Sequence, residues 1–85
     1  MPFFDLLWDL DDDPEGNVFH IGEHGLTKDD VYQVLSEPDR EAVSDSSGRP
    51  MAFGYGVGGE YLAVVYEVID ETLLYPVTAF RVDEA

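Results

Sequence analysis

The two histidines are the first candidates for chemistry in this sequence, because they stand four positions apart. On a helix, His20 and His24 would share a face, where both imidazoles could reach one metal ion. A carboxylate such as Glu23, or one from the Asp run at 11–13, could complete the site. The alternative is one packed or capping histidine and one on the surface, which we favour in so acidic a chain. We therefore assign neither a metal nor a cofactor.

Two arginines are the second candidates, because guanidinium groups stabilise the charge that develops on a phosphate during phosphodiester cleavage. Arg49 precedes one expected strand and Arg81 ends another, so both could face the same side of a sheet. The simpler interpretation makes each a surface charge paired with one of the nineteen acidic residues. The sequence indicates no nucleophilic residue, since the chain has no Gly-x-Ser-x-Gly motif and no cysteine.

Helices are the first elements expected to position these residues. A short helix should begin at Asn17, and Gly25 is suited to end it in a left-handed conformation. Thr27, followed three residues later by Asp30, resembles a capping box with Asp in place of the usual Glu. Apolar residues at helical spacing follow, which predicts a second helix over 28–36.

Strands are expected both before and after these helices. Apolar or alternating runs occupy residues 3–8, 41–44, 51–55, 61–68 and 73–82. The fourth run is apolar almost throughout, which indicates a central strand covered on both faces. Pro76 lies inside the last run and cannot donate a hydrogen bond to a neighbouring strand. We therefore expect a bulge there, or that the edge of the strand to which its nitrogen points has no partner strand. The predicted fold is α+β: one domain over residues 1–85, with two short N-terminal helices packed on a three- to four-stranded antiparallel sheet.

Charge limits the partners of this chain more strongly than any motif does. Nineteen acidic residues against four basic ones give a formal net charge of −15. Such a surface repels phosphate backbones and favours a basic protein or cations, or it serves only solubility and tolerance of salt. No apolar run approaches the roughly 20 residues of a membrane span, and the N-terminus lacks the basic region of a secretory signal. We expect a cytoplasmic protein without membrane contact.

Short motifs along most of the chain resemble the BrnT-type toxins of bacterial type II toxin–antitoxin pairs. In chain order they are Leu7-Trp8-Asp9, Asn17 with His24-Gly25, residues 26–31, the expected hairpin from 49–54 to 64–66, and residues 77–81. The resemblance implies a RelE-like fold and a ribonuclease that blocks translation until a ribbon-helix-helix antitoxin binds it. It also implies a catalytic site in which His24 donates or accepts a proton while Arg49 and Arg81 bind the RNA phosphate.

The chain departs from this family at positions that matter for catalysis. Glu23 stands where the family usually has Lys before His-Gly, and the sequence ends at Ala85, before the family's basic C-terminal helix. Its net charge is also the opposite of what an RNA-cutting surface needs. We therefore predict a BrnT-like protein, weakly active or inactive as a ribonuclease, that binds a basic protein such as a ribbon-helix-helix antitoxin. The alternatives are an active ribonuclease toxin that binds RNA, and an acidic mimic of nucleic acid.

Overall fold

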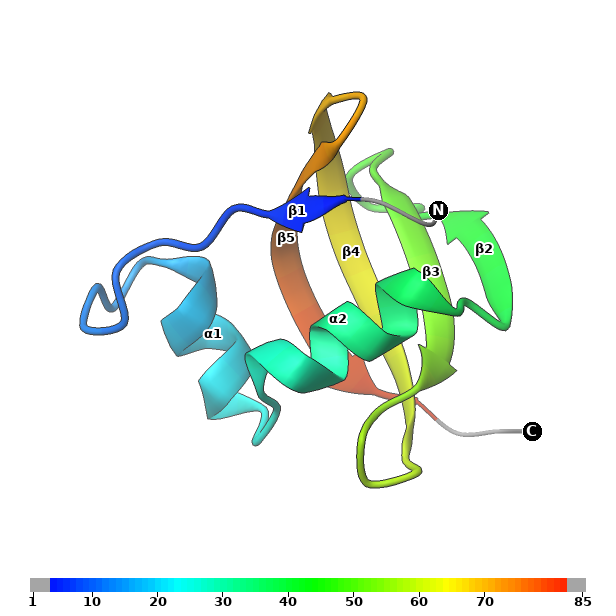
Figure 1. Ribbon diagram of the computed structural model, residues 1–85, viewed down its shortest axis with the longest axis horizontal. Helices are drawn as coiled ribbons and strands as arrows, with labels where there is room; N and C mark the ends of the chain where they lie inside the picture. The colour runs from blue at the N-terminus through cyan, green and yellow to red at the C-terminus, as the bar shows by residue number, and fades with distance from the viewer. Residues whose placement is uncertain (1–3, 83–85) are drawn as a thin grey trace.

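The computed structural model describes residues 4–82, in which two helices and five strands follow in the order β1-α1-α2-β2-β3-β4-β5 (Figure 1). Their bounds are β1 (Asp5–Leu6), α1 (Asn17–Glu23), α2 (Lys28–Ser36), β2 (Arg40–Val43), β3 (Pro50–Tyr55), β4 (Tyr61–Asp70) and β5 (Leu73–Arg81). The predicted α+β class and the two N-terminal helices are confirmed. Phe3, the first residue of the expected N-terminal strand, lies outside the described residues.

The sheet is larger than the sequence predicted. Its five strands lie in the order β1-β5-β4-β3-β2, and all neighbours are antiparallel except β1, which runs parallel to β5. The three- to four-stranded antiparallel sheet was therefore an incomplete prediction. The physical reason is the open edge of β5: the N–H of Asp5 donates to Thr72 O and that of Leu7 to Leu74 O, at 2.6 and 2.9 Å, which adds a short parallel strand.

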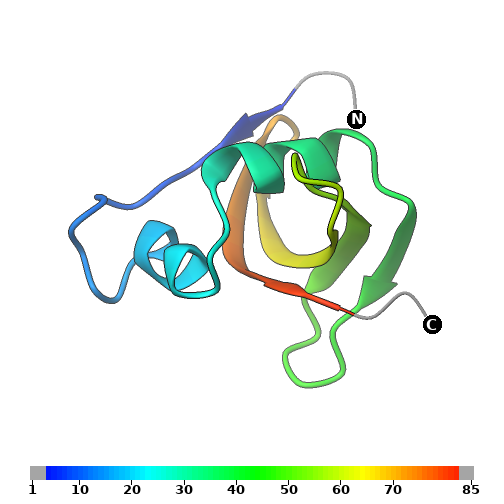
Figure 2. The same ribbon diagram turned by 90° about the horizontal axis from the view of Figure 1, so that it is seen from below.

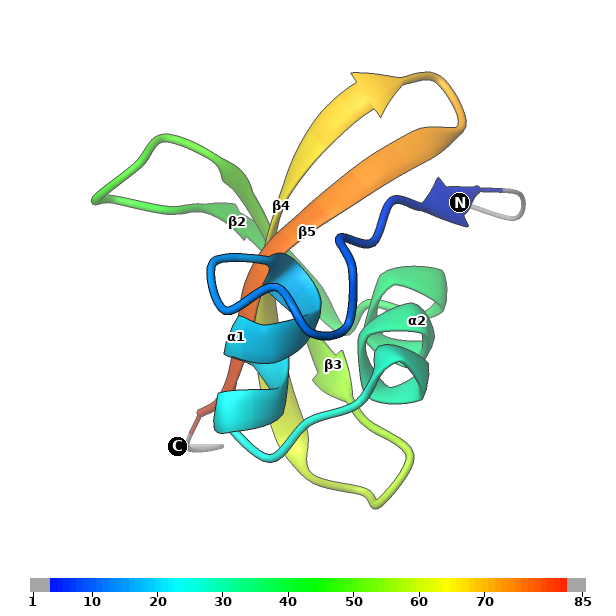
Figure 3. The same ribbon diagram turned by 90° about the vertical axis from the view of Figure 1, so that its left-hand side faces the viewer.

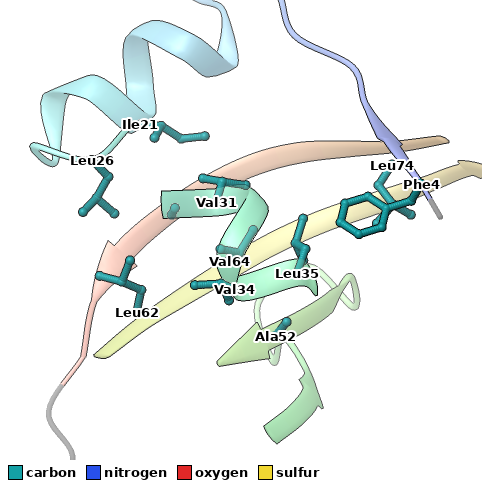
Figure 4. Packing of buried hydrophobic residues seen from close by; sticks show 11 residues of the cluster. Phe4, Ile21, Leu26, Val31, Val34, Leu35, Ala52, Leu62, Val64 and Leu74 are labelled. Atoms are coloured by element: carbon teal, nitrogen blue, oxygen red, sulfur yellow. The ribbon is translucent and has the colours of Figure 1, made fainter. Parts of the chain in front are cut away.

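Helix α2 has the bounds that its capping box predicted. The Thr27 hydroxyl accepts a hydrogen bond from the N–H of Asp30 at 3.2 Å, and the Asp30 carboxylate accepts one from the N–H of Thr27 at 2.9 Å. The buried residues of α2 are Val31, Val34 and Leu35. They face β3 and β4 across the hydrophobic core, as the close view in Figure 4 shows. This face of α2 fixes the helix on the sheet.

Strand β4 is the centre of the sheet, as its apolar sequence predicted. Leu62 and Val64 pack in the core under the helices, and Ala63 and Val65, which alternate with them, are buried as well. Ala63 lies between Phe53 of β3 and Phe80 of β5 in the register, so large neighbouring side chains cover it. Both helices lie on one face of the sheet, which curves around α2 (Figure 2; Figure 3).

The bulge expected near Pro76 is present. Val65 stands opposite Thr78, but the next residue, Tyr66, stands opposite Pro76, so Val77 is the extra residue. The bulge interrupts the hydrogen-bond ladder next to the proline, which cannot donate a hydrogen bond to it. Among residues 4–82, no helix has both the length and the apolar character needed to cross a membrane.

Candidate functional site

The structure brings two of the residues predicted for catalysis, His24 and Arg81, into contact. His24 follows α1, and Arg81 is the last residue of β5. A guanidinium N–H of Arg81 donates to the main-chain oxygen of His24. Gly25 makes this approach possible, because its φ of +76° is the left-handed conformation predicted for the helix stop, and a Cβ there would lie 3.4 Å from Nη2 of Arg81. The contact thus orders the end of α1.

The charge of Arg81 is neutralised where it stands. Its Nε donates to one carboxylate oxygen of Glu60, and its Nη2 donates to the other at 3.3 Å. This hydrogen bonding, together with the charge of Glu60, raises the pKa of Arg81 above its ordinary value. A phosphate that binds this guanidinium in bidentate fashion through Nε and Nη2 would have to displace the carboxylate of Glu60.

Among the described residues, the His24 imidazole has no partner that would orient it for proton transfer. The side chain is exposed, and its nearest ring contact is a tilted one with Phe80, at 6.5 Å between centroids. Within residues 4–82, no carboxylate or carbonyl accepts a hydrogen bond from either ring nitrogen of His24. A general base normally needs such a group to fix its tautomer and direction.

Arg49 lies at the opposite end of the sheet from Arg81. Its Nε donates to Glu67 Oε1 at 2.7 Å. Glu67 stands five residues beyond Leu62, the β4 residue opposite Arg81, which is roughly 16 Å along the strand. An odd separation also puts Leu62 and Glu67 on opposite faces. The expectation that Arg49 and Arg81 share one side of the sheet is therefore wrong.

The other two basic residues of the chain also have partners. Lys28 Nζ lies 3.3 Å from Asp11 Oδ1 and 5.7 Å from the centre of the Trp8 ring. The guanidinium of Arg40 lies over the Phe53 ring at 4.3 Å. The sequence contains four Lys and Arg residues, and each of them contacts a carboxylate or an aromatic ring of the same chain.

The histidine pair does not gather metal ligands. His20 Nδ1 lies 3.4 Å from Glu23 Oε1, three residues along the same helix, and both side chains are exposed. Within the described part of the chain, no three His, Asp or Glu side chains come close enough together to hold a metal ion. The arrangement is a surface contact between two exposed side chains at helical spacing.

A polar network centred on the buried Asn17, which we call the Asn17 junction, connects the segment after β1 with α1 and β5. Asn17 Nδ2 donates to Leu7 O and to Pro76 O, both at 2.9 Å, and its Oδ1 accepts from the N–H of Asp9 at 2.9 Å. The Asp9 carboxylate in turn accepts from the N–H of Asn17 at 3.0 Å and from the Tyr75 hydroxyl at 2.5 Å. Every polar atom of the buried Asn17 side chain is thus satisfied.

The Asn17 junction also sets the acid–base properties of two side chains. The hydrogen bond from Tyr75, followed by the one from the N–H of Asn17, lowers the pKa of Asp9. The same bond to the Asp9 carboxylate, with help from burial, raises the pKa of Tyr75 to about 12. Sequence reasoning found Asp9 and Asn17 only as motif residues. The structure adds that both residues stabilise the fold through hydrogen bonds to each other and to β5.

A further feature is a groove on the outer side of α2. Two hollows, of about 390 and 220 Å³, flank Tyr32 and share Asp29 as a lining residue. The larger hollow is also lined by Glu37 and Val57, and the smaller by Asp5. We call the two hollows together the α2 groove.

Comparison with known proteins finds no match to a family model, to a curated protein or to a solved structure.

Proposed function

We propose that this protein is a BrnT-like member of the RelE-like fold class that acts in the cytoplasm by binding a basic protein, with its ribonuclease activity weak or lost. A ribbon-helix-helix antitoxin is the proposed partner. One observation carries the proposal: all four basic residues are engaged with internal partners, while nineteen acidic residues give the chain a net charge of −15. A protein in this state has little with which to attract or hold RNA.

The positions of the BrnT-like motifs support the choice of fold. The chain runs from a strand through two helices into antiparallel strands. Asp9 and Asn17, from the first two motifs, meet in the Asn17 junction, and Gly25 ends α1 in the left-handed conformation. These motif residues stabilise the fold, and a relative without catalytic activity would keep them for that reason.

The geometry around His24 supports weak catalysis. Phosphodiester cleavage needs an oriented proton donor or acceptor and cations aimed at the scissile phosphate. Here the His24 ring lacks an orienting partner among the described residues, Arg81 is paired with Glu60, and Arg49 lies at the far end of the sheet. No phosphate group could touch all three side chains at once.

A ribonuclease assay tests the catalytic half of the proposal. The purified chain is incubated with a long single-stranded RNA, beside its His24→Ala variant, and is also expressed in bacteria while growth and bulk RNA are followed. We expect intact RNA and normal growth from both proteins at equal soluble levels. RNA cleavage that disappears in the His24→Ala variant would instead establish the active toxin.

Affinity capture tests the binding half. Electrostatic complementarity chiefly sets the association rate and the specificity of binding, and salt screens it. We expect the tagged chain to retain one basic protein at low salt and to release most of it at high salt. Recovery of an acidic protein, or of a partner whose retention does not change with salt, would contradict the proposal.

The active ribonuclease remains the second candidate because the structure places His24 beside Arg81. The His24 ring is exposed, and the Arg81 guanidinium reaches the main chain of the same residue. If RNA displaced Glu60, the guanidinium and the imidazole could meet one phosphate. In that case Glu60→Gln would raise RNA cleavage, whereas the binding proposal expects no cleavage from either protein.

A further inference from the structure

We propose that the α2 groove is the docking surface for the basic partner, and that it takes arginine or lysine side chains of a partner segment on both sides of Tyr32. The inference rests on the proposed function and names the part of the surface that performs it. Its grounds are the shape of the groove, its unpaired carboxylates and its fixed apolar wall.

Tyr32 forms the ridge of the groove. With Asp29, Gln33 and Ser36 it belongs to the outward stripe of α2, since these residues recur at helical spacing opposite the buried Val31, Val34 and Leu35. The Phe4 ring stacks on Tyr32 at 5.1 Å between centroids, and Tyr32 nevertheless stays 50% exposed. A ring held by one aromatic neighbour and open to solvent is suited to contact a cation.

Three carboxylates of the groove have no ion-pair partner among the described residues. Among residues 4–82, no side chain forms an ion pair or a hydrogen bond with the carboxylates of Asp5, Asp29 or Glu37. The nearby Asp30 differs, because its carboxylate accepts hydrogen bonds from the N–H groups of Thr27 and Val57 at 2.9 Å each. Lys28, which also borders the smaller hollow, is held by Asp11. Within the described part of the chain, the carboxylates of Asp5, Asp29 and Glu37 thus remain available to an external cation.

The apolar wall of the groove is held in place by α2 itself. Val57, at the turn between β3 and β4, is 63% exposed, yet its N–H donates to Asp30 Oδ1. Gln33 Nε2 donates to Tyr55 O and Gly56 O at 3.0 and 3.1 Å. Gly56 allows this close approach, because a Cβ there would lie 2.8 Å from Asp30 Oδ1. These hydrogen bonds tie the turn to α2, and Figure 2 shows the β3–β4 hairpin beside the helix.

This combination matches the chemistry of arginine and lysine. Their aliphatic stems pack on apolar surface such as Val57, while their charged heads reach carboxylates and aromatic rings. Arginine suits the site best, since its planar group both stacks on rings and pairs with carboxylates. A second copy of this chain is disfavoured by its charge of −15, and RNA by repulsion between phosphates and the carboxylates of the groove.

A peptide titration tests the groove. The probe is a synthetic peptide in which arginine and leucine alternate, added to the isotope-labelled full chain and followed by amide chemical shifts in nuclear magnetic resonance. We expect the shifted amides to cluster in α2, in residues 55–57 and in β1. An exposed ion pair contributes a few-fold to affinity, so Asp29→Asn with Glu37→Gln should weaken binding roughly tenfold.

Matched variants separate the groove from the overall charge. Asp45→Asn with Glu71→Gln removes the same charge at exposed positions outside the groove and should change the affinity much less. Tyr32→Phe should keep most of the affinity and Tyr32→Ser should lose it. Equal weakening by the two double variants, or shifts that cluster on the helix-free face of the sheet, would overturn the proposal. So would concentration-dependent self-association of the chain, which would make a second copy the occupant.

The outcomes also separate this inference from the proposed function. Strong RNA cleavage by the chain that His24→Ala abolishes would refute the proposed function, whichever residues the peptide shifts. Peptide binding outside the groove, by a chain that does not cleave RNA, would refute the groove alone.

Discussion

Two side-chain amides in this molecule each donate to two main-chain oxygens, one from a buried position and the other from an exposed one. Asn17 Nδ2 donates to two main-chain oxygens, those of Leu7 and Pro76, and Gln33 Nε2 donates to those of Tyr55 and Gly56. Asn17 is 2% exposed, at the centre of a network that joins three elements, whereas Gln33 is exposed on the α2 groove. Water can therefore replace the Gln33 amide more easily than the Asn17 amide, whose bond to Pro76 O is buried.

The acidic residues divide in the same way. At the Asn17 junction, the Asp9 carboxylate accepts hydrogen bonds from the N–H of Asn17 and from Tyr75. At the groove, Asp29 and Glu37 have no such donors among the described residues. The chain thus uses some of its acidic residues to hold the fold and leaves others available to a partner. Stability should depend on the first set and binding on the second.

The largest effect is expected from Asn17→Leu. The substitution leaves Pro76 O without its partner in a buried place, a loss that costs about 1–3 kcal/mol. Leu7 O and the N–H of Asp9 lose theirs in part-buried places, where each loss costs less. We expect the free energy of unfolding to fall by about 3 kcal/mol or more, measured by urea denaturation. A loss below about 1 kcal/mol would show that water enters the junction, and the contrast with Gln33 would then disappear.

The next effect is a dependence of stability on pH that Tyr75 controls. Its pKa is raised to about 12 from 10.0, so it stabilises the fold below pH 10, and this contribution is lost as the pH rises through 12. The pKa of Asp9 is lowered in the folded protein, so its carboxylate stabilises the fold at pH values above the ordinary pKa of aspartate. This stabilisation is lost as the pH falls through the lowered pKa. Tyr75→Phe should flatten the alkaline loss and weaken the acid one in unfolding curves measured across pH. Identical curves for the two proteins would contradict the assignment.

Gln33→Leu is the matched test on the exposed side. The same number of carbonyl hydrogen bonds is lost, but solvent replaces them, so we expect a loss of about 0.5–1 kcal/mol in the same urea assay. Amide hydrogen exchange at Val57 should rise at the same time, because the turn loses one of its two ties to α2. A loss as large as that of Asn17→Leu would mean that the turn is part of the core.

The smallest effect on stability is expected from Asp29→Asn with Glu37→Gln, the pair that should weaken peptide binding roughly tenfold. Asp29 lies in the first turn of α2, where a negative charge is worth about 0.3–1 kcal/mol. Relief of self-repulsion in so acidic a chain acts in the opposite direction. We expect a thermal midpoint within a few degrees of that of the parent protein. A large drop would show that these carboxylates serve the fold.

The sequence predicted elements best where local chemistry decides them. The capping box of Thr27 and Asp30 sets the start of α2, Gly25 supplies the left-handed stop, and Pro76 requires the bulge in β5. Each of these signals lies within a few residues of the structure it produces. The parallel pairing of β1 was missed because it joins the two ends of the chain.

The candidate site was harder to predict, because pairing of charges is a property of tertiary structure. Arg49 and Arg81 find Glu67 and Glu60, which stand 18 and 21 positions away. Composition alone made such pairs probable in a chain with nineteen acidic residues, but it could not say which acidic residues stay unpaired. The α2 groove needed the turn at Val57 to be placed against the helix, which no local pattern indicates.

The long reach of the Asn17 junction has a consequence for the order of folding. Its bonds from Asn17 to Pro76 and from Tyr75 to Asp9 close loops of 59 and 66 positions, while β3, β4 and β5 pair through short turns. Closing long loops costs more entropy, so the hairpins should form in the rate-limiting step and the junction after it. Substitutions at Asn17 should then accelerate unfolding and leave the refolding rate nearly unchanged. The junction would form last, so it determines the unfolding rate of the protein more than its folding rate.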